Sequence, residues 1–230
     1  MEISPELDSY PLCRFFLSGY LAKKQDHGNF PPDDPGKFQR YEKLFASALQ
    51  ALSLQPEALR RRPEFNFDSG DENNLESGIA ILRIVVFLTE KNFLRIALIP
   101  STSTTGADIT CEGNGQKVCC EVKAITKTSS GRTGLFLEDQ VYEKIRESIP
   151  KARRQLKATA AQLECQIVIA VFVMNWLLPS FTLDQSDFQK IVNRLEQDQE
   201  LDGIDGVMVL TATGDPQLFL KRPDALGFPK

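Results

Sequence analysis

The dipeptide Asn114-Gly115 is the feature that most constrains how this chain can fold. Asn-Gly between strand-like segments is the strongest short signal for a two-residue β-hairpin with a type I′ turn. Such a turn places Gly113 opposite Gln116. If this register continues along both strands, Asp108 lies opposite Glu121, with Cβ atoms roughly 4.5–5.5 Å apart.

The two faces of this hairpin are predicted to differ in character. Side chains alternate along a strand, so Lys123 shares the polar face of Asp108 and Glu121. The other face is apolar and is expected to belong to the core; it consists of Ala107, Ile109, Cys111, Val118, Cys120 and Val122. Two opposed carboxylates repel at a cost of roughly 0.2–1 kcal/mol, and a divalent cation between them would offset that repulsion. The alternative is a polar face that meets solvent, where a Glu121–Lys123 pair contributes little.

Composition narrows the class of protein. The chain has 230 residues, of which 42% are hydrophobic and 25% charged, as in an ordinary globular protein with a core. No apolar run reaches the length of a membrane span, and the acidic start MEISPELDSY is a poor signal peptide. Five Cys without a CxxC spacing and a single His argue against a disulfide framework and a zinc site. We therefore expect a cytoplasmic protein with no membrane partner.

Charge is unevenly distributed along the chain. The net charge is −4, yet residues 117–160 contain ten Lys or Arg and only five Asp or Glu. A basic segment directly after the paired carboxylates suits a site that holds both a metal ion and a phosphodiester. The alternative for any one of these cations is a solvated helix face.

Periodicity and turn residues predict the order of elements. The predicted helices are 11–25, 37–52, 75–91, 138–164 with an interruption at Pro150, and 186–199; the predicted strands are 94–99, 106–112, 116–125, 166–175 and 206–210. Residues 56–74 and the tail from 215 are expected to be irregular. This order predicts an α/β protein with a mixed sheet flanked by helices. We expect an N-terminal helical extension or layer over 1–69 and a main domain over 70–230.

In this order the chain resembles the PD-(D/E)XK nuclease superfamily, which has the restriction-endonuclease-like fold. The resemblance covers roughly residues 70–175, and it is carried by Glu76 on the leading helix, Asp108 and Glu121-x-Lys123 on the hairpin, and Gln155 on the following helix. Two positions depart from patterns found in the superfamily. Ala107 stands where many members have Pro, and Thr159 follows Gln155 where some branches have Tyr.

The resemblance implies a metal-dependent nuclease that hydrolyses phosphodiester bonds, most naturally in DNA. Asp108, Glu121 and the backbone carbonyl of Val122 would offer oxygen ligands, which suit Mg²⁺ or Mn²⁺. Lys123 would steer the attacking water and balance charge, and Glu76 would complete the metal shell. The residues expected to contact the phosphate backbone are Gln155, Lys151, Arg154 and Lys157.

Other interpretations of these residues stay open at the level of sequence. Glu76 lies three residues after Asn73 and could be the acid of a capping box at a helix start. Gln155 could be an ordinary surface residue of its helix. The whole chain could be a catalytically inactive relative that binds nucleic acid or a partner protein, since a fold does not fix a function.

Overall fold

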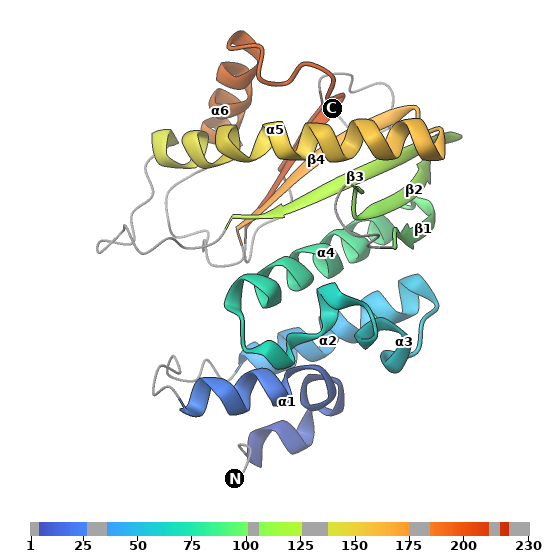
Figure 1. Cartoon of the computed structure of the whole chain (residues 1–230), viewed down its shortest axis with the longest axis vertical. Coiled ribbons are helices and arrows are strands. Elements are labelled where there is room, and N and C mark those ends of the chain that lie inside the picture. The colour runs from blue at the N-terminus through green and yellow to red at the C-terminus, as the bar shows by residue number, and fades with distance from the viewer. Residues whose placement is uncertain are drawn as a thin grey trace. The chain divides into compact units, whose positions relative to one another are not determined.

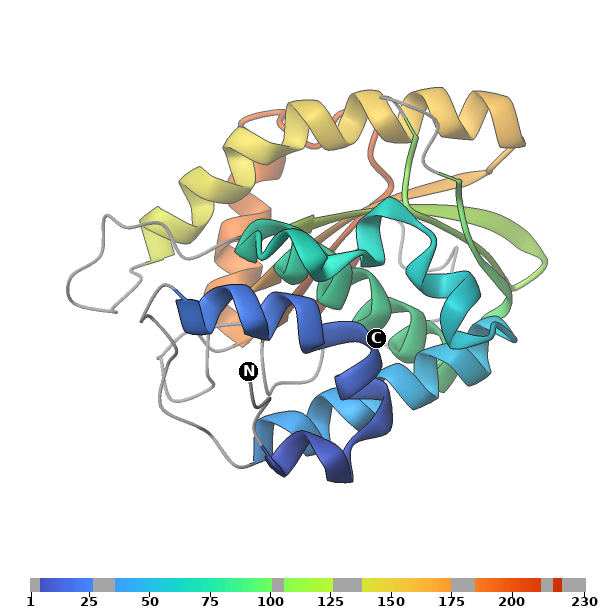
Figure 2. The same cartoon turned by 60° about the horizontal axis from the view of Figure 1, so that its bottom comes forward.

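The computed structural model describes residues 5–26, 36–100, 106–125, 138–174, 185–211 and 217–220. The chain divides into two compact units, Met1–Glu90 and Lys91–Lys230. Figures 1 and 2 show the helices and strands of both units. The predicted boundary lies between residues 69 and 70, whereas the observed division lies after Glu90. The helix Glu72–Glu90 therefore groups with the helices that precede it.

The first unit is helical. It contains α1 (Pro11–Asp26), α2 (Gly36–Leu52), α3 (Pro56–Arg60) and α4 (Glu72–Glu90), with 3-10 turns at Pro5–Ser9, Pro63–Phe65 and Phe67–Ser69. Its core includes Phe16 and Phe45, whose rings stack with centroids 4.5 Å apart. The apolar run in α4 forms the predicted buried helix. The region 56–74, predicted to be irregular, instead contains α3, the second and third of these 3-10 turns, and the first residues of α4.

The start of α4 rules out the capping-box interpretation of Glu76. The helix begins at Glu72, and the backbone N–H of Asn73 donates to Asp71 Oδ1 at 2.9 Å. Asp71 therefore occupies the capping position that the sequence assigned to Asn73, because its carboxylate accepts a bond from the second helical residue. Glu76 lies one turn further into the helix.

The second unit is built on one six-stranded mixed sheet. Its strands lie in sequential order, as β1 (Leu94–Leu98), β2 (Ile109–Gly113), β3 (Gln116–Ala124), β4 (Ile167–Met174), β5 (Gly206–Thr211) and β6 (Gln217–Leu220). Strands β3, β4 and β5 run parallel, and the remaining neighbours pair antiparallel. The mixed α/β class predicted from the sequence is confirmed. The expectation of an irregular tail from 215 is wrong at β6, which extends the sheet by pairing with β5.

The hairpin between β2 and β3 forms in the predicted register. Gly113 pairs with Gln116, and the ladder continues to Ile109 opposite Cys120. Both turn residues have positive φ, 50° at Asn114 and 72° at Gly115, as a type I′ turn requires. Local turn chemistry therefore sets the alignment of the two strands.

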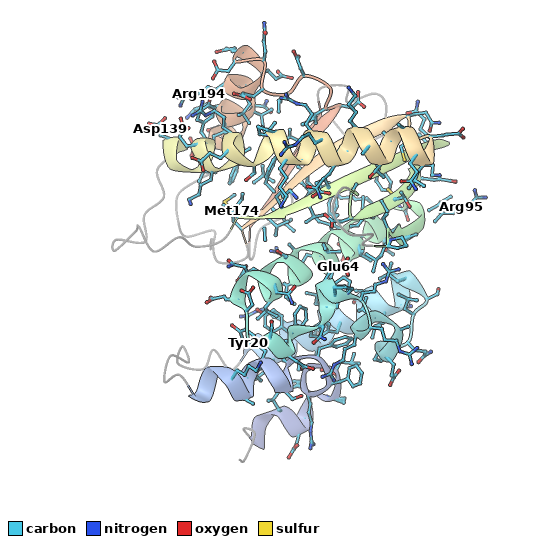
Figure 3. All side chains as sticks on the ribbon, in the orientation of Figure 1. Tyr20, Glu64, Arg95, Asp139, Met174 and Arg194 are labelled. Atoms are coloured by element: carbon cyan, nitrogen blue, oxygen red, sulfur yellow. The ribbon has the colours of Figure 1, made fainter. Side chains whose placement is uncertain are left out.

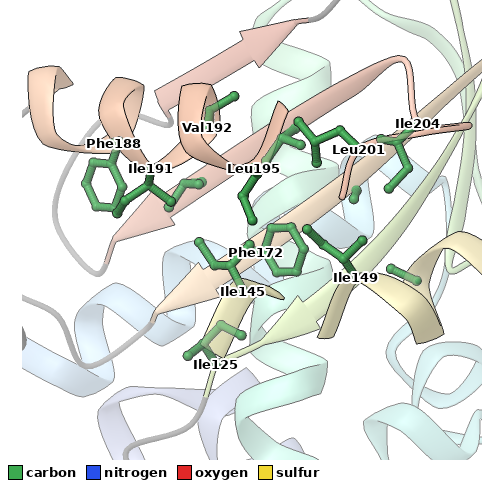
Figure 4. Close-up of a cluster of buried hydrophobic side chains, with 14 of the residues drawn as sticks. Ile125, Ile145, Ile149, Phe172, Phe188, Ile191, Val192, Leu195, Leu201 and Ile204 are labelled. Atoms are coloured by element: carbon green, nitrogen blue, oxygen red, sulfur yellow. The ribbon is translucent and has the colours of Figure 1, made fainter. Parts of the chain in front are cut away.

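One face of the sheet packs against α5 (Glu138–Leu163) and α6 (Gln185–Gln197). Figure 4 shows Ile145 and Ile149 of α5 beside Phe172 of β4, with Ile191 and Leu195 of α6 in the same cluster. The predicted interruption at Pro150 is wrong, because α5 continues through it. Apolar residues on both sides of Pro150 are fully buried, so tertiary packing holds the two halves in one helix despite the missing N–H.

Within the described residues, no helix is both long enough and apolar enough to cross a membrane.

Candidate active site

Glu121 is buried in the middle of β3. Only 1% of its surface is exposed, and the side chain of Lys123 is 17% exposed. Cys119, two residues earlier on the same face, belongs to the buried cluster beneath α5. The alternative in which this face meets solvent is therefore wrong. Ala107 belongs to the same cluster, so its predicted place on the opposite face of the hairpin is wrong as well.

Asp108 lies one residue before β2, where the ladder with β3 has ended. Its backbone N–H donates to the carbonyl of Cys120 at 3.0 Å, and its carbonyl accepts from Ile99 N at 2.9 Å. Its carboxylate Oδ2 accepts from the backbone N–H of Val122 at 2.7 Å. The side chain of Asp108 thus bonds a β3 amide just before the first residue of β2. Asp108 and Glu121 are neighbours through this contact rather than as a regular strand pair.

Lys123 joins Glu121 to α5. Its ammonium forms an ion pair with Glu121 Oε1 and donates to Gln155 Oε1 at 2.8 Å. The other end of the Gln155 amide donates to the carbonyl of Gly106 at 3.1 Å. Gln155 is therefore a member of the site, and the interpretation of it as an ordinary surface residue is wrong.

The electrostatic state of Glu121 is unusual for a carboxylate. Burial and the neighbouring charge of Asp108 raise its pKa to about 8, against the lowering effect of Lys123 and Lys151. Its second oxygen, Oε2, is buried and has no hydrogen-bond partner among the residues that the structure describes. A strongly perturbed pKa with specific charge partners is typical of functional sites.

The predicted cations on α5 do not all face this cluster. Lys151 precedes Gln155 by one turn and is close enough to lower the pKa of Glu121. Lys157 follows Gln155 by two residues, which turns it about 200° around the helix. Arg154 and Lys157 are both exposed. The structure thus brings Lys151 to the acidic cluster and directs Lys157 away from it.

Glu76 lies in the first unit, on α4. Its charge contributes to raising the pKa of Tyr20, which burial and nearby acids bring to about 12. It also opposes the effect of burial on Arg83, whose pKa is lowered to about 10. Within its own unit, Glu76 therefore interacts with Tyr20 and Arg83. Its role in a metal shell stays a prediction.

The two carboxylates fit a divalent cation by their chemistry. Asp108 and Glu121 supply oxygen atoms, and the buried Oε2 of Glu121 is the kind of group that a bound cation would satisfy. Among the described residues, no group of three or more His, Cys, Asp or Glu side chains converges on one point. A cation here would therefore depend on the two carboxylates together with the predicted carbonyl of Val122.

Sequence reasoning missed one member of the site, Thr159. Its hydroxyl accepts a 2.7 Å hydrogen bond from the backbone N–H of Ala107, and its side chain is buried. The available signal was its spacing from Gln155, because residues four apart on a helix share a face.

No protein-family model, curated protein or solved structure matches this chain.

Proposed function

We propose that this protein is a metal-dependent nuclease that hydrolyses phosphodiester bonds in DNA, on a restriction-endonuclease-like version of its α/β fold. The observation that carries the proposal is the state of Glu121. This carboxylate is buried beside that of Asp108, it has a pKa raised to about 8, and it keeps one oxygen unsatisfied by the described residues.

The energetic argument favours a functional site over a structural one. Among the described residues Glu121 is the only buried Asp, Glu, Lys or Arg, and the buried hydroxyl of Thr159 belongs to the same cluster. Burying a charged group costs free energy unless it is paired and fully hydrogen-bonded. An apolar residue at position 121 would serve the core better, so the carboxylate is better explained by a ligand that it binds.

Each residue of the cluster has a distinct role in the proposed reaction. Asp108, Glu121 and the carbonyl of Val122 hold the cation, Mg²⁺ or Mn²⁺. When bound, such an ion supplies Lewis-acid activation of water and stabilises charge on the phosphate. Lys123 brings a positive charge to the same place, where it neutralises charge developing on the phosphate oxygens.

The residues around this centre contribute to substrate binding. Lys151 is exposed on the face of α5 that meets the cluster, so it is the best placed of the helix cations to contact a phosphate near the reacting one. Arg154 and Lys157 would contact the backbone further away, where their effect depends on salt.

The proposal is tested by cleavage assays on the full chain. Plasmid, linear duplex, single-stranded and branched DNA are incubated with Mg²⁺, Mn²⁺ or EDTA, beside an RNA of matched sequence. We expect metal-dependent cleavage of DNA that is lost in Lys123→Met, which keeps an unbranched side chain only one atom shorter and removes its charge. Lys157→Ala is the matched control and should keep turnover at saturating substrate.

Two outcomes would contradict the proposal. Cleavage by Lys123→Met at the parent rate would show that the activity comes from another site or from a contaminant. DNA binding without cleavage under every metal condition would favour the alternative of a binding module.

A further inference from the structure

Two residues of α5 hold the backbone immediately before Asp108. Gln155 Nε2 donates to the carbonyl of Gly106 at 3.1 Å, and Thr159 Oγ1 accepts from the N–H of Ala107 at 2.7 Å. These contacts join positions 49 and 52 residues apart in the chain. They come from successive turns of one helix face, so a single surface of α5 fixes two consecutive residues.

The same helix face also holds the lysine of the site. The amide oxygen of Gln155 accepts from Lys123 Nζ at 2.8 Å while its nitrogen binds Gly106. Because an amide has one accepting end and one donating end, the two contacts fix its orientation. Gln155 therefore sets the distance between the backbone before Asp108 and the ammonium beside Glu121.

We propose that Gln155 and Thr159 form a clamp that positions Asp108 against Glu121 for binding a divalent cation. They are positioning residues, because they act through the backbone of Gly106 and Ala107 and through Lys123. This inference rests on the proposed function, and it assigns to Thr159 a role that neither motif nor composition indicates.

Burial of Thr159 supports this role. A hydroxyl inside a helix–sheet interface needs a partner, and the partner here is a backbone N–H directly before a proposed ligand. A helix that needed only to pack would do so with Val at this position. Outer contacts that orient metal ligands typically change metal affinity or activity by roughly 10–100-fold when they are removed.

The test compares isosteric variants by calorimetric titration of the full chain with Mn²⁺. Thr159→Val keeps the shape and removes the hydroxyl, Thr159→Ser keeps the hydroxyl, and Gln155→Met removes the amide. We expect Thr159→Val and Gln155→Met to weaken Mn²⁺ binding on the order of tenfold. Thr159→Ser should bind within about twofold of the parent, since it rescues the contact that the Val variant loses.

Matched controls separate positioning from general destabilisation. Thr89→Val removes a helix Thr hydroxyl that bonds the Val85 carbonyl at 2.9 Å, and Gln189→Met removes a Gln side-chain bond to Asn193 at 2.8 Å. Both should leave Mn²⁺ affinity unchanged. Urea unfolding without metal measures the stability of every variant, so a loss of affinity is not mistaken for a loss of fold.

Each outcome decides a specific claim. If the parent binds Mn²⁺ and Thr159→Val and Gln155→Met bind as tightly, the clamp is refuted while the proposed function stands. A Thr159→Ser variant as weak as Thr159→Val would also refute it, because the hydroxyl would not be the feature that matters. A parent that binds no Mn²⁺ overturns both claims. If Thr159→Val does not fold, Gln155→Met and Thr159→Ser decide the question.

Discussion

The two halves of α5 support polar groups in opposite ways. Near its start, Tyr142 donates to Asp198 at 2.5 Å, and Arg194 lies 3.7 Å over the Tyr142 ring. Figure 3 shows Arg194 and Asp139 close together at this end, where they form a 2.7 Å ion pair. These charges are largely exposed, so water compensates them and the pairs need little from the protein.

The second half of α5 has polar groups that water cannot compensate. Gln155 accepts from Lys123, which pairs with Glu121, and the buried Thr159 bonds the backbone before Asp108. Glu121 itself is buried with a pKa of about 8. The first half illustrates how a helix is attached to a sheet at low cost, with polar pairs at the rim and apolar residues inside. The second half departs from that pattern where it packs over buried polar groups, Glu121 and Thr159. These buried polar groups are the reason to assign a function to this part of the molecule.

The largest effect on stability is expected from the buried apolar residues in the first half of α5. Ile149→Ala should lower the free energy of unfolding by about 2–5 kcal/mol, because it opens a cavity in a fully buried cluster. Urea denaturation measures this directly. A cost well under 1 kcal/mol would show that the cluster does not hold α5 to the sheet, and the contrast between the two halves would lose its basis.

A smaller effect, with a distinctive pH dependence, is expected from Glu121→Gln. The folded pKa of about 8 lies above the ordinary value of 4.5, so between these pH values the native state keeps a proton that the unfolded chain has lost. Raising the pH therefore lowers the free energy of unfolding, with a slope of at most about 1.4 kcal/mol per pH unit from this group.

The Gln variant cannot titrate at position 121, so its stability relative to the parent should rise across this window in metal-free buffer. Urea denaturation at closely spaced pH values provides the comparison. Parallel stability curves for parent and variant would mean that Glu121 is not a perturbed carboxylate.

The smallest expected effect is a change in the pKa of Glu121, and it should differ between two exposed lysines of α5. The charge of Lys151 lowers the pKa of Glu121, so Lys151→Ala should raise that pKa further. Lys157→Ala, on the other side of the helix, should not change it. NMR titration of the Glu121 carboxyl carbon distinguishes the two variants, and equal shifts would contradict the arrangement of α5 over the site.

What the sequence predicts here depends on how local the cause is. The register of the hairpin follows from two turn residues, Asn114 and Gly115. That register predicts Asp108 opposite Glu121, but the ladder ends at Ile109, and the bond from Val122 N–H to the Asp108 carboxylate brings the two acids together instead. Pro150 shows the reverse case, because distant packing overrides its local tendency to end a helix. β6 was missed for a similar reason, since its partner strand β5 rather than its own composition makes it a strand.

The candidate site divides in the same way. Glu121 and Lys123 are two residues apart on one strand, so their ion pair is predictable from alternation alone. The bond from Ala107 to Thr159 spans 52 residues and depends on how α5 docks on the sheet. No pattern in the sequence contains that docking, and the clamp therefore becomes visible only in the structure.

The central claim is that the paired carboxylates bind a divalent cation, and calorimetric titration of the parent with Mg²⁺ and Mn²⁺ at pH 8.5 tests it most directly. This pH lies above the raised pKa of Glu121, which must lose its proton before it can bind a metal ion. The account predicts one site per chain, lost in both Asp108→Asn and Glu121→Gln and retained in Lys157→Ala. Absence of binding in the parent, or undiminished binding in Glu121→Gln, would contradict it.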